Sequence, residues 1–322
     1  MMQATIRTRA RPVTTRSRLI LEMASELVGL EEWKDKQIKL QLREQGAPRW
    51  NLTFFASDAP SGIDEVIRGD ADLGIINPVE PLTLAYRGTG PYKNPSPLRV
   101  ITTRPSADQL GFAVSEQTGL NSLAEIRERR YPLKVTLRGQ RDHSVQPMVE
   151  DTLAAYGYSL DDIRSWGGEV RYDPGLPDAP NRIGAVGRGE INAIFDEAVN
   201  VWGNMALDLN MRFLPLEEPI LKNLEAVGYR RALITKAAVP KITKDVMSLD
   251  FSGWAVFTRA DVSDEVVTFV CHGIEARKDK VPWQGTGPLP IERMCIDSPD
   301  TPMDVPLHPA AERFWRERGY LR

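Results

Sequence analysis

The sequence predicts an α/β protein with two lobes, each a mixed sheet flanked by helices, and a ligand cleft between the lobes. Two stretches match without a gap at an offset of 120 residues: residues 58–70 read DAPSGIDEVIRGD and residues 178–190 read DAPNRIGAVGRGE. An apolar run follows each stretch and ends in a polar group, Asn77 in the first copy and Asp196 with Glu197 in the second. The chain has 322 residues, enough for two domains, so two copies of one unit predict two lobes of similar build.

Each copy is predicted to contain a loop, a short helix, a glycine stop and a buried strand. An Asp or Ser side chain can cap the helix, with a proline near its first turn. Ile63, Val66 and Ile67 recur at helical spacing, and Gly69 ends the helix. The alternative is a chance match of common loop residues, but chance does not explain why both copies run into a strand that ends in polar groups.

Apolar periodicity predicts the other elements of the first part of the chain in order. A strand at residues 5–8 leads into a helix at residues 19–30, whose leucines and methionine recur on one face. The further elements are a strand at 52–55, the first copy, a helix at 82–86, a Gly/Pro-rich loop at 88–97 and a strand at 98–103.

The second part of the chain begins with an extended segment at residues 109–114 that crosses between the lobes. Ser122 and Ser263 are expected to cap helices at 123–126 and 264–277. The remaining elements are strands at 133–137, 212–214, 229–234 and 254–258, helices at 145–156 and 198–209, the second copy, and a last amphipathic helix from Ala310. This order assigns residues 1–108 and 232–322 to lobe I and residues 109–231 to lobe II.

Composition excludes several classes of partner. The net charge of −3 gives no global signature of nucleic-acid or membrane binding. No window approaches eighteen uninterrupted apolar residues. We therefore expect no nucleic-acid partner and no direct membrane insertion.

The first residues, MMQATIRTR, are rich in arginine and lack the apolar core of a secretory signal peptide. The sequence as given therefore favours the cytoplasm, whereas a leader removed from the natural protein would place it in the periplasm. A transit sequence and a first strand are both compatible with this start.

No metal or cofactor is expected. Cys271 and Cys295 lack the spacing of a metal or redox pair, so a free, inert thiol is expected for Cys271, on a buried helix. His272 and His308 are interpreted as structural, and three scattered histidines without matching carboxylates give no metal site. Phosphate-binding glycine loops, nucleotide fingerprints and Ser-His-Asp spacing are not found in the sequence.

The order of lobe, crossing segment, lobe and return resembles the type II periplasmic-binding-protein fold. More narrowly, residues 63–76, 119–126 and 307–319 resemble segments of the TAXI-type solute receptors of TRAP transporters, within the wider NMT1/THI5-like group. The resemblance implies a receptor for a small solute, with TRAP membrane subunits as partners if the protein is exported. Residues 11–18 and 138–144 depart from the glycine-rich ligand loops of that family, which points to a different ligand.

Both divergent loops are predicted to lie between a strand end and a helix start, where backbone N–H groups and the helix dipole attract anions. Their arginines can bind carboxylates bidentately, so we expect a small organic acid with more than one anionic group, an aromatic dicarboxylate for example. The alternative is that these arginines form surface ion pairs. The candidate ligand-binding residues are Thr14, Thr15, Arg16, Arg18, Ser57, Asn77, Arg138, Arg141, His143, Ser144, Asp196 and Glu197.

Three of the candidate roles have alternatives. His143 could donate to an anion, act as a general acid or base, or lie unused at the surface. Asp196 and Glu197 could accept from a ligand amine or hydroxyl, or cap the next helix. Trp202 could stack on a planar ligand or belong to the core.

The leading interpretation is a binding protein that closes on a small anionic solute without covalent chemistry. The alternative is a cytoplasmic lyase of the same fold, similar to the dihydroxyphthalate decarboxylase type, in which arginines hold one carboxylate and His143 protonates the carbon that loses carbon dioxide. A third interpretation is a cytoplasmic ligand sensor that acts through a partner.

Overall fold

The computed structural model of the protein describes residues 19–21, 23–25, 38–43, 51–56 and 59–322. The chain divides into two compact units, residues 1–36 and residues 37–322. In the first unit, residues 19–21 and 23–25 are helical, in agreement with part of the helix predicted at 19–30. The strand predicted at residues 5–8 lies outside the described residues.

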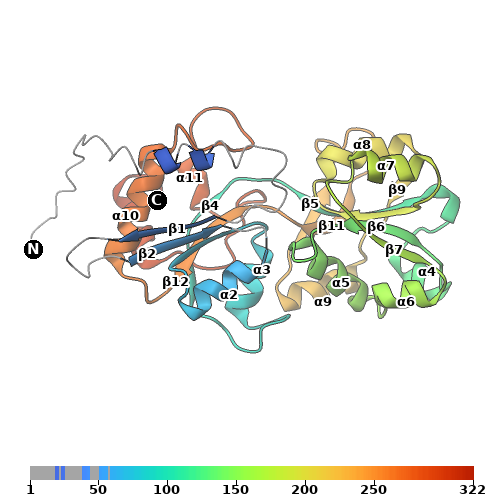
Figure 1. The fold of residues 1–322 in the computed structure, drawn as a ribbon, viewed down its shortest axis with the longest axis horizontal. Helices are drawn as coiled ribbons and strands as arrows, with labels where there is room; N and C mark the ends of the chain where they lie inside the picture. The colour runs from blue at the N-terminus through green and yellow to red at the C-terminus, as the bar shows by residue number, and fades with distance from the viewer. Residues whose placement is uncertain (1–18, 22, 26–37, 44–50, 57–58) are drawn as a thin grey trace, which may run out of the picture. The chain divides into compact units, whose positions relative to one another are not determined.

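Two mixed sheets with helices on both faces form the second unit, which confirms the predicted fold class (Figure 1). In the five-stranded sheet, β12 runs antiparallel to both of its neighbours, β3 and β4, whereas β2 and β3 are parallel. The order across this sheet is β1 (Ile38–Arg43), β2 (Asn51–Ala56), β3 (Leu73–Ile76), β12 (Trp254–Arg259) and β4 (Leu98–Arg104).

Adjacent residues of β4 point to opposite faces of this sheet, and both faces are covered. Val100 packs in a core with residues of α2 (Ser61–Arg68) and α3 (Glu80–Arg87). Ile101 packs in another core with residues of three C-terminal helices, α10 (Asp264–Arg277), α11 (Ile291–Met294) and α12 (Pro309–Glu317).

The seven-stranded sheet is parallel across β7, β6 and β8 and antiparallel where β5 joins β8. Its order is β10 (Arg231–Ile234), β11 (Val246–Asp250), β5 (Gln109–Ser115), β8 (Ala193–Asp196), β6 (Lys134–Arg138) and β7 (Glu169–Asp173), with β9 (Met211–Phe213) also paired to β5.

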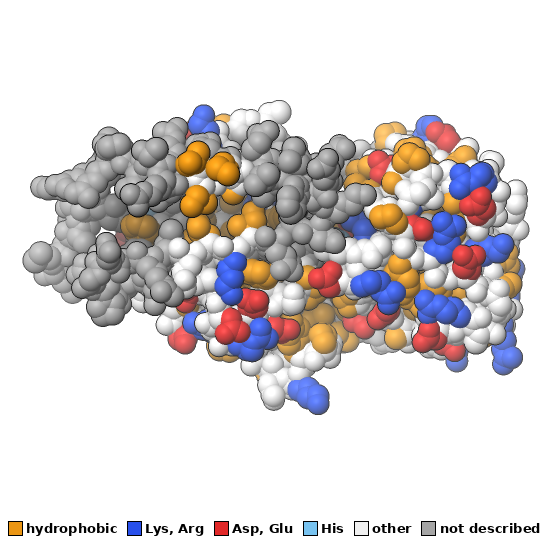
Figure 2. Space-filling view, viewed as in Figure 1, with side chains coloured by type: hydrophobic (Ala, Val, Ile, Leu, Met, Phe, Trp, Pro, Cys, Tyr) orange, Lys and Arg blue, Asp and Glu red, His pale blue; other side chains and the backbone are white. Residues whose placement is uncertain are grey.

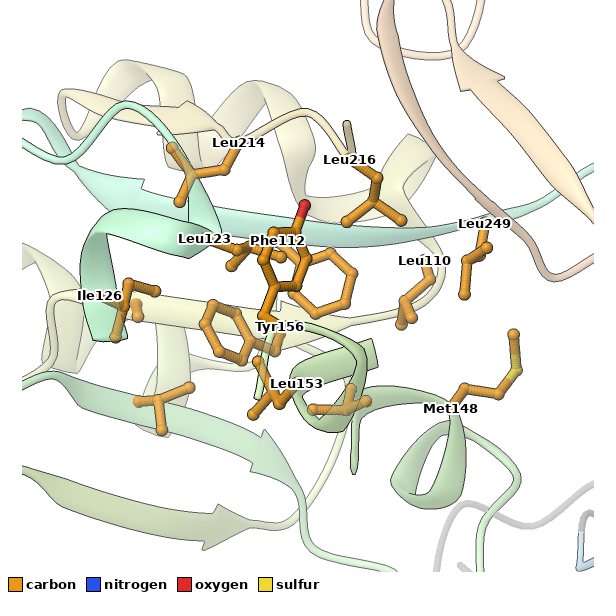
Figure 3. Close-up of a cluster of buried hydrophobic side chains, with 14 of the residues drawn as sticks. Leu110, Phe112, Leu123, Ile126, Met148, Leu153, Tyr156, Leu214, Leu216 and Leu249 are labelled. Atoms are coloured by element: carbon orange, nitrogen blue, oxygen red, sulfur yellow. The ribbon is translucent and has the colours of Figure 1, made fainter. Parts of the chain in front are cut away.

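Helices cover both faces of this sheet as well. The core on one face lies around Phe112 and Tyr156 (Figure 3) and includes residues of α4 (Leu123–Glu128), α5 (Val145–Ala155), α6 (Leu160–Ser165) and α9 (Glu218–Val227). Trp202 is the largest side chain of the opposite core, which α7 (Pro180–Gly187) and α8 (Val199–Asp208) form. A short 3-10 helix, Glu116–Thr118, follows β5.

The two sequence copies have the same local structure. Gly69 and Gly189, at equivalent positions, both adopt left-handed backbone angles, with φ of 80° and 73°. The next residue donates its N–H to a carbonyl five residues earlier in both copies, over 2.9 Å in the first and 3.0 Å in the second. Glycine adopts this conformation without a Cβ clash, so it ends the helical turn in both copies: Gly69 is the C-cap of α2, and Gly189 follows Arg188, the C-cap of α7.

The strands that follow are also fixed in the same way. The Asp72 side chain accepts from the Thr53 N–H over 2.8 Å, and its equivalent, Asn192, accepts from the Lys134 N–H over 2.7 Å. The duplicated unit is therefore confirmed. The predicted Ser or Asp caps are wrong, because Pro60 and Ala179 occupy the cap positions and neither makes a side-chain cap.

Most predicted elements within the described residues are confirmed, including the caps at Ser122 and Ser263. The prediction lacked β1, α6, β7, α9, β11 and α11. The lobe boundaries stay a prediction. Because β10 and β11 join β5, a boundary drawn by sheet membership alone would fall between β11 and β12.

Cys271 and Cys295 are both free and buried, as expected for Cys271. Burial raises the pKa of Cys295 to about 12 and raises that of Cys271 further, so both thiols stay protonated. Among the helices within the described residues, none has the length and apolar character needed to span a bilayer.

Gly74 of β3 lies opposite Phe257 of β12, and a Cβ at Gly74 would lie 2.4 Å from the ring Cζ. We expect Gly74→Ala to lower the free energy of unfolding by about 1–3 kcal/mol, because the buried ring must move. Urea unfolding measures the effect. Gly273→Ala is the control: Gly273 lies on α10 with open space around it, and alanine there should stabilise the helix by roughly 0.5–1 kcal/mol. Equal effects in the two variants would contradict the prediction.

Candidate functional site

Three predicted site residues lie together at the carboxyl ends of β6 and β8, which are parallel neighbours. Arg138 ends β6, and its Nη2 donates to Asp196 Oδ1 over 3.0 Å. The same nitrogen also pairs with Glu197, the residue after β8. The side chains of Arg138 and Glu197 keep 13% and 11% of their surface exposed, so this pair reaches solvent.

A second arginine, Arg182 of α7, binds the other side of Asp196. Its Nη1 donates to Asp196 Oδ2 over 2.6 Å, and both side chains are fully buried. Burial alone would raise the pKa of Asp196, but the charges of Arg138 and Arg182 outweigh burial and hold that pKa below its ordinary value. Asp196 is therefore an ionised carboxylate between two guanidinium groups.

Asp108, just before β5, completes this cluster. Its carboxylate accepts from the Ala198 N–H over 2.9 Å and from the Gln109 N–H over 2.7 Å. Desolvation and, after it, the nearby Glu197 charge raise the pKa of Asp108 well above its ordinary value. Both effects favour the protonated form of Asp108. We define Arg138, Arg182, Asp108, Asp196 and Glu197 as the arginine–carboxylate cluster.

His143 is buried at the start of α5, which rules out a surface position. Its ring stacks on Phe251 with centroids 6.1 Å apart, and its Nδ1 accepts from the Val145 N–H over 3.2 Å. Burial, then the charge of Arg138, lowers the pKa of His143 to about 4. The imidazole is thus neutral at pH 7, with its proton on Nε2.

Asn77 and Ser144 connect the two sheets. Ser144 Oγ donates to the Asn77 carbonyl over 3.4 Å, and Asn77 Nδ2 donates to the Gly253 carbonyl over 2.8 Å. This contact places the end of β3 near the start of α5, as the strand-end rule predicts for a ligand site of this fold class.

The other candidates are placed differently. The Arg141 guanidinium lies 3.6 Å above the centre of the Tyr172 ring and takes no part in the ion pairs of the cluster. Trp202 belongs to the core, where its Nε1 donates to the Glu197 carbonyl over 2.7 Å. Thr14, Thr15, Arg16, Arg18 and Ser57 lie outside the described residues.

Surface ion pairs, the alternative for the arginines, occur elsewhere on the molecule. Basic and acidic side chains are interspersed over the face of the seven-stranded sheet region that Figure 2 shows. Arg188 with Glu190 and Arg231 with Glu218 are examples of pairs that reach the surface. Arg138 differs from them because its partners are buried or nearly buried.

The sequence prediction missed Arg182 and Asp108. Arg182 is equivalent to Gly62 in the first copy, so a large charged residue stands where the duplicate has glycine. This difference between the two copies was the sequence feature that could have indicated a site role for Arg182. For Asp108 the only such feature was weaker: its position directly before the predicted crossing segment.

A second pair of buried carboxyl groups lies near the crossing strands. Glu80 of α3 and Asp250 of β11 are both almost fully buried. Burial, with the charge of Asp250, raises the pKa of Glu80 well above its ordinary value, and burial raises that of Asp250 to about 6. No group of three or more His, Cys, Asp or Glu side chains among the described residues is arranged to hold a metal ion.

Comparison with known proteins gives one family match. A model of the NMT1-like family matches residues 51–319, more than four fifths of the chain. This match confirms the wider group that the sequence resemblance indicated, while the TAXI type stays a prediction.

Solved structures resemble the chain at 10–11% identity. The match to PhnD1 from Prochlorococcus marinus, in complex with methylphosphonate, covers 81% of this chain and 83% of the PhnD1 chain, with a TM-score of 0.37. Lactococcal OpuAC with glycine betaine covers 81% and 82%, with a TM-score of 0.35. A putative periplasmic sulfonate-binding protein from Methylobacillus flagellatus covers 75% and 68%, with a TM-score of 0.34.

Proposed function

Because the chain belongs to the NMT1-like family, we propose that it binds a small anionic organic solute, a carboxylate or dicarboxylate, at the guanidinium of Arg138. The observation that carries the proposal is the partial exposure of Arg138 within the arginine–carboxylate cluster. Arg182 is fully buried, whereas Arg138 has 13% of its side-chain surface exposed. Arg138 can therefore bind a solute while Asp196 holds it in place.

The groups around Arg138 suit a carboxylate. A guanidinium binds a carboxylate bidentately, and each charge-assisted hydrogen bond contributes roughly 1.5–3 kcal/mol. The Nε2–H of His143 is a neutral donor near the start of α5, because the Nδ1 of the same ring accepts from the Val145 N–H. Closure of the two lobes over the solute would exclude water and strengthen these contacts. In this proposal the protein is a periplasmic receptor, and its partners are TRAP-type membrane subunits.

Arg138→Gln tests the proposal. We expect it to weaken binding of the tightest ligand from a thermal-shift screen of mono- and dicarboxylic acids at least tenfold, by loss of about 1.5–3 kcal/mol. Isothermal titration calorimetry measures the affinity.

Arg231→Gln is the matched control, since Arg231 also pairs with two carboxylates but lies at the surface beside α9. It should leave the affinity unchanged. The proposal fails if Arg138→Gln, shown by circular dichroism to be folded, binds as tightly as the wild type.

A carboxy-lyase is the second candidate function, and one observation favours it. Such an enzyme needs a proton donor for the carbon that loses carbon dioxide. His143 is neutral at pH 7, but the raised pKa of Asp108 favours a proton on that carboxyl group, near the Glu197 that pairs with Arg138. Product analysis of each screening hit distinguishes the two functions: a receptor returns its ligand unchanged, and a lyase returns a product smaller by one carbon dioxide.

A further inference from the structure

We propose that in the free protein Glu197 occupies the place on Arg138 that a ligand carboxylate takes, and that binding of the ligand is coupled to uptake of one proton by Asp108 and Glu197. The inference rests on the proposed function, because it needs an anion at Arg138. It adds a competing group within the protein and a pH dependence of affinity.

The geometry shows which of the two carboxylates on Arg138 can leave. Asp196 is fully buried, receives 2.6 Å and 3.0 Å bonds from Arg182 and Arg138, and also accepts from the Glu197 N–H over 2.9 Å. Glu197 also pairs with Arg138, but 11% of its side chain is exposed to solvent. Asp196 is thus a fixed partner of Arg138, and Glu197 is the partner that a ligand can displace.

The charges of the cluster favour proton uptake when an anion binds. The two arginines already pair with Asp196 and Glu197, and Asp108 binds the N–H of Ala198, the residue after Glu197, so the cluster has no surplus of positive charge. A ligand carboxylate that displaces Glu197 adds one negative charge in a poorly hydrated site, where an unpaired charge is costly. Uptake of one proton by Asp108 and Glu197 offsets that charge.

The charged and titratable groups around the Arg138–Glu197 pair come from five segments. They are Arg138 at the end of β6, Asp196 at the end of β8, Arg182 from α7, Asp108 before β5 and His143 before α5. Asp196 stays ionised, because the charges of the two arginines hold its pKa below its ordinary value. His143 has a pKa of about 4, since burial and Arg138 oppose its protonation, so the carboxyl pair is the favoured proton acceptor.

Calorimetry on the full chain tests the inference, with phthalate as the probe at pH 7, where both of its carboxylates are ionised. Titrations in bis-Tris and in Tris separate the heat of proton exchange from the heat of binding. We expect an uptake of close to one proton per phthalate. Linkage then requires the affinity to fall up to tenfold for each unit of rising pH.

The double variant Asp108→Asn with Glu197→Gln removes both proton acceptors and the competing carboxylate. It should bind phthalate more tightly than the wild type at pH 7, with no proton uptake. Glu190→Gln is the control, because it removes a carboxylate from an exposed arginine pair and should keep the wild-type uptake.

The wild-type measurement decides the matter even if the double variant does not fold. Binding of phthalate without proton uptake would overturn this inference and leave the proposed function standing. Uptake that persists in the folded double variant would overturn it as well. Failure of both phthalate and succinate to bind the wild type would count against the proposed function and the inference together.

Discussion

Asp196→Ala is expected to lower the free energy of unfolding by about 3–5 kcal/mol, because it leaves a buried guanidinium without its anion. Arg182 is fully buried, and its remaining partners are neutral: its Nε donates to Thr136 Oγ1 over 3.1 Å and its Nη1 to the Gly175 carbonyl over 2.9 Å. Neither partner supplies a negative charge. Urea unfolding at 25 °C and pH 7 measures the loss.

Two further variants separate the buried charge from the lost contacts. Asp196→Leu combined with Arg182→Met removes both charges and keeps apolar volume, so it should cost less than Asp196→Ala alone. Glu190→Ala breaks the exposed pair with Arg188 and should leave the free energy of unfolding nearly unchanged, because solvent screens that pair. If the free energy of unfolding of Asp196→Ala lay within about 1 kcal/mol of the wild-type value, water would have to solvate the Arg182 guanidinium. That outcome would contradict the full burial of Arg182.

Much of the fold was predictable because its core elements carry strong apolar periodicity. The strand β5 is covered on both faces and its buried centre reads LGFAV, a nearly continuous apolar run that is typical of a central strand. By contrast, β7 (EVRYD) is an edge strand with no fully buried residue, and α6 has only six residues. Such elements depend on tertiary packing, and their own sequence gives little signal.

The site was predictable where strand ends define it. Arg138, Asp196 and Glu197 were found because polar residues after buried strands of an α/β sheet collect at one edge. Their mutual ion pairs were not predicted, since a sequence does not say which carboxylate faces which guanidinium. Arg182 was missed for a related reason: an arginine on a short helix is normally solvated, and only the structure shows that Asp196 lies within 2.6 Å.

His143 should make stability depend on pH in the acid range. Its pKa falls from an ordinary value of 6.5 to about 4 in the folded protein, because of burial and then the charge of Arg138. Between these values the unfolded chain binds a proton that the folded protein does not, so acid favours unfolding. The contribution is complete above pH 6.5 and is lost as the pH falls towards 4, at about 1.4 kcal/mol per pH unit and roughly 3 kcal/mol in all.

The measurement is the difference in unfolding free energy between the wild type and His143→Gln, taken from pH 4 to pH 8. The difference is needed because the raised pKa values of Asp108 and Glu80 act in the opposite sense: their contributions are present at low pH and are lost as the pH rises. Those carboxyl groups are common to both proteins, so their effects largely cancel. The difference should be constant above pH 7.5 and shrink steadily below pH 6.5. A difference that stays constant down to pH 4 would show that the folded protein protonates His143 as readily as the unfolded chain does, so that neither its burial nor Arg138 disfavours the imidazolium.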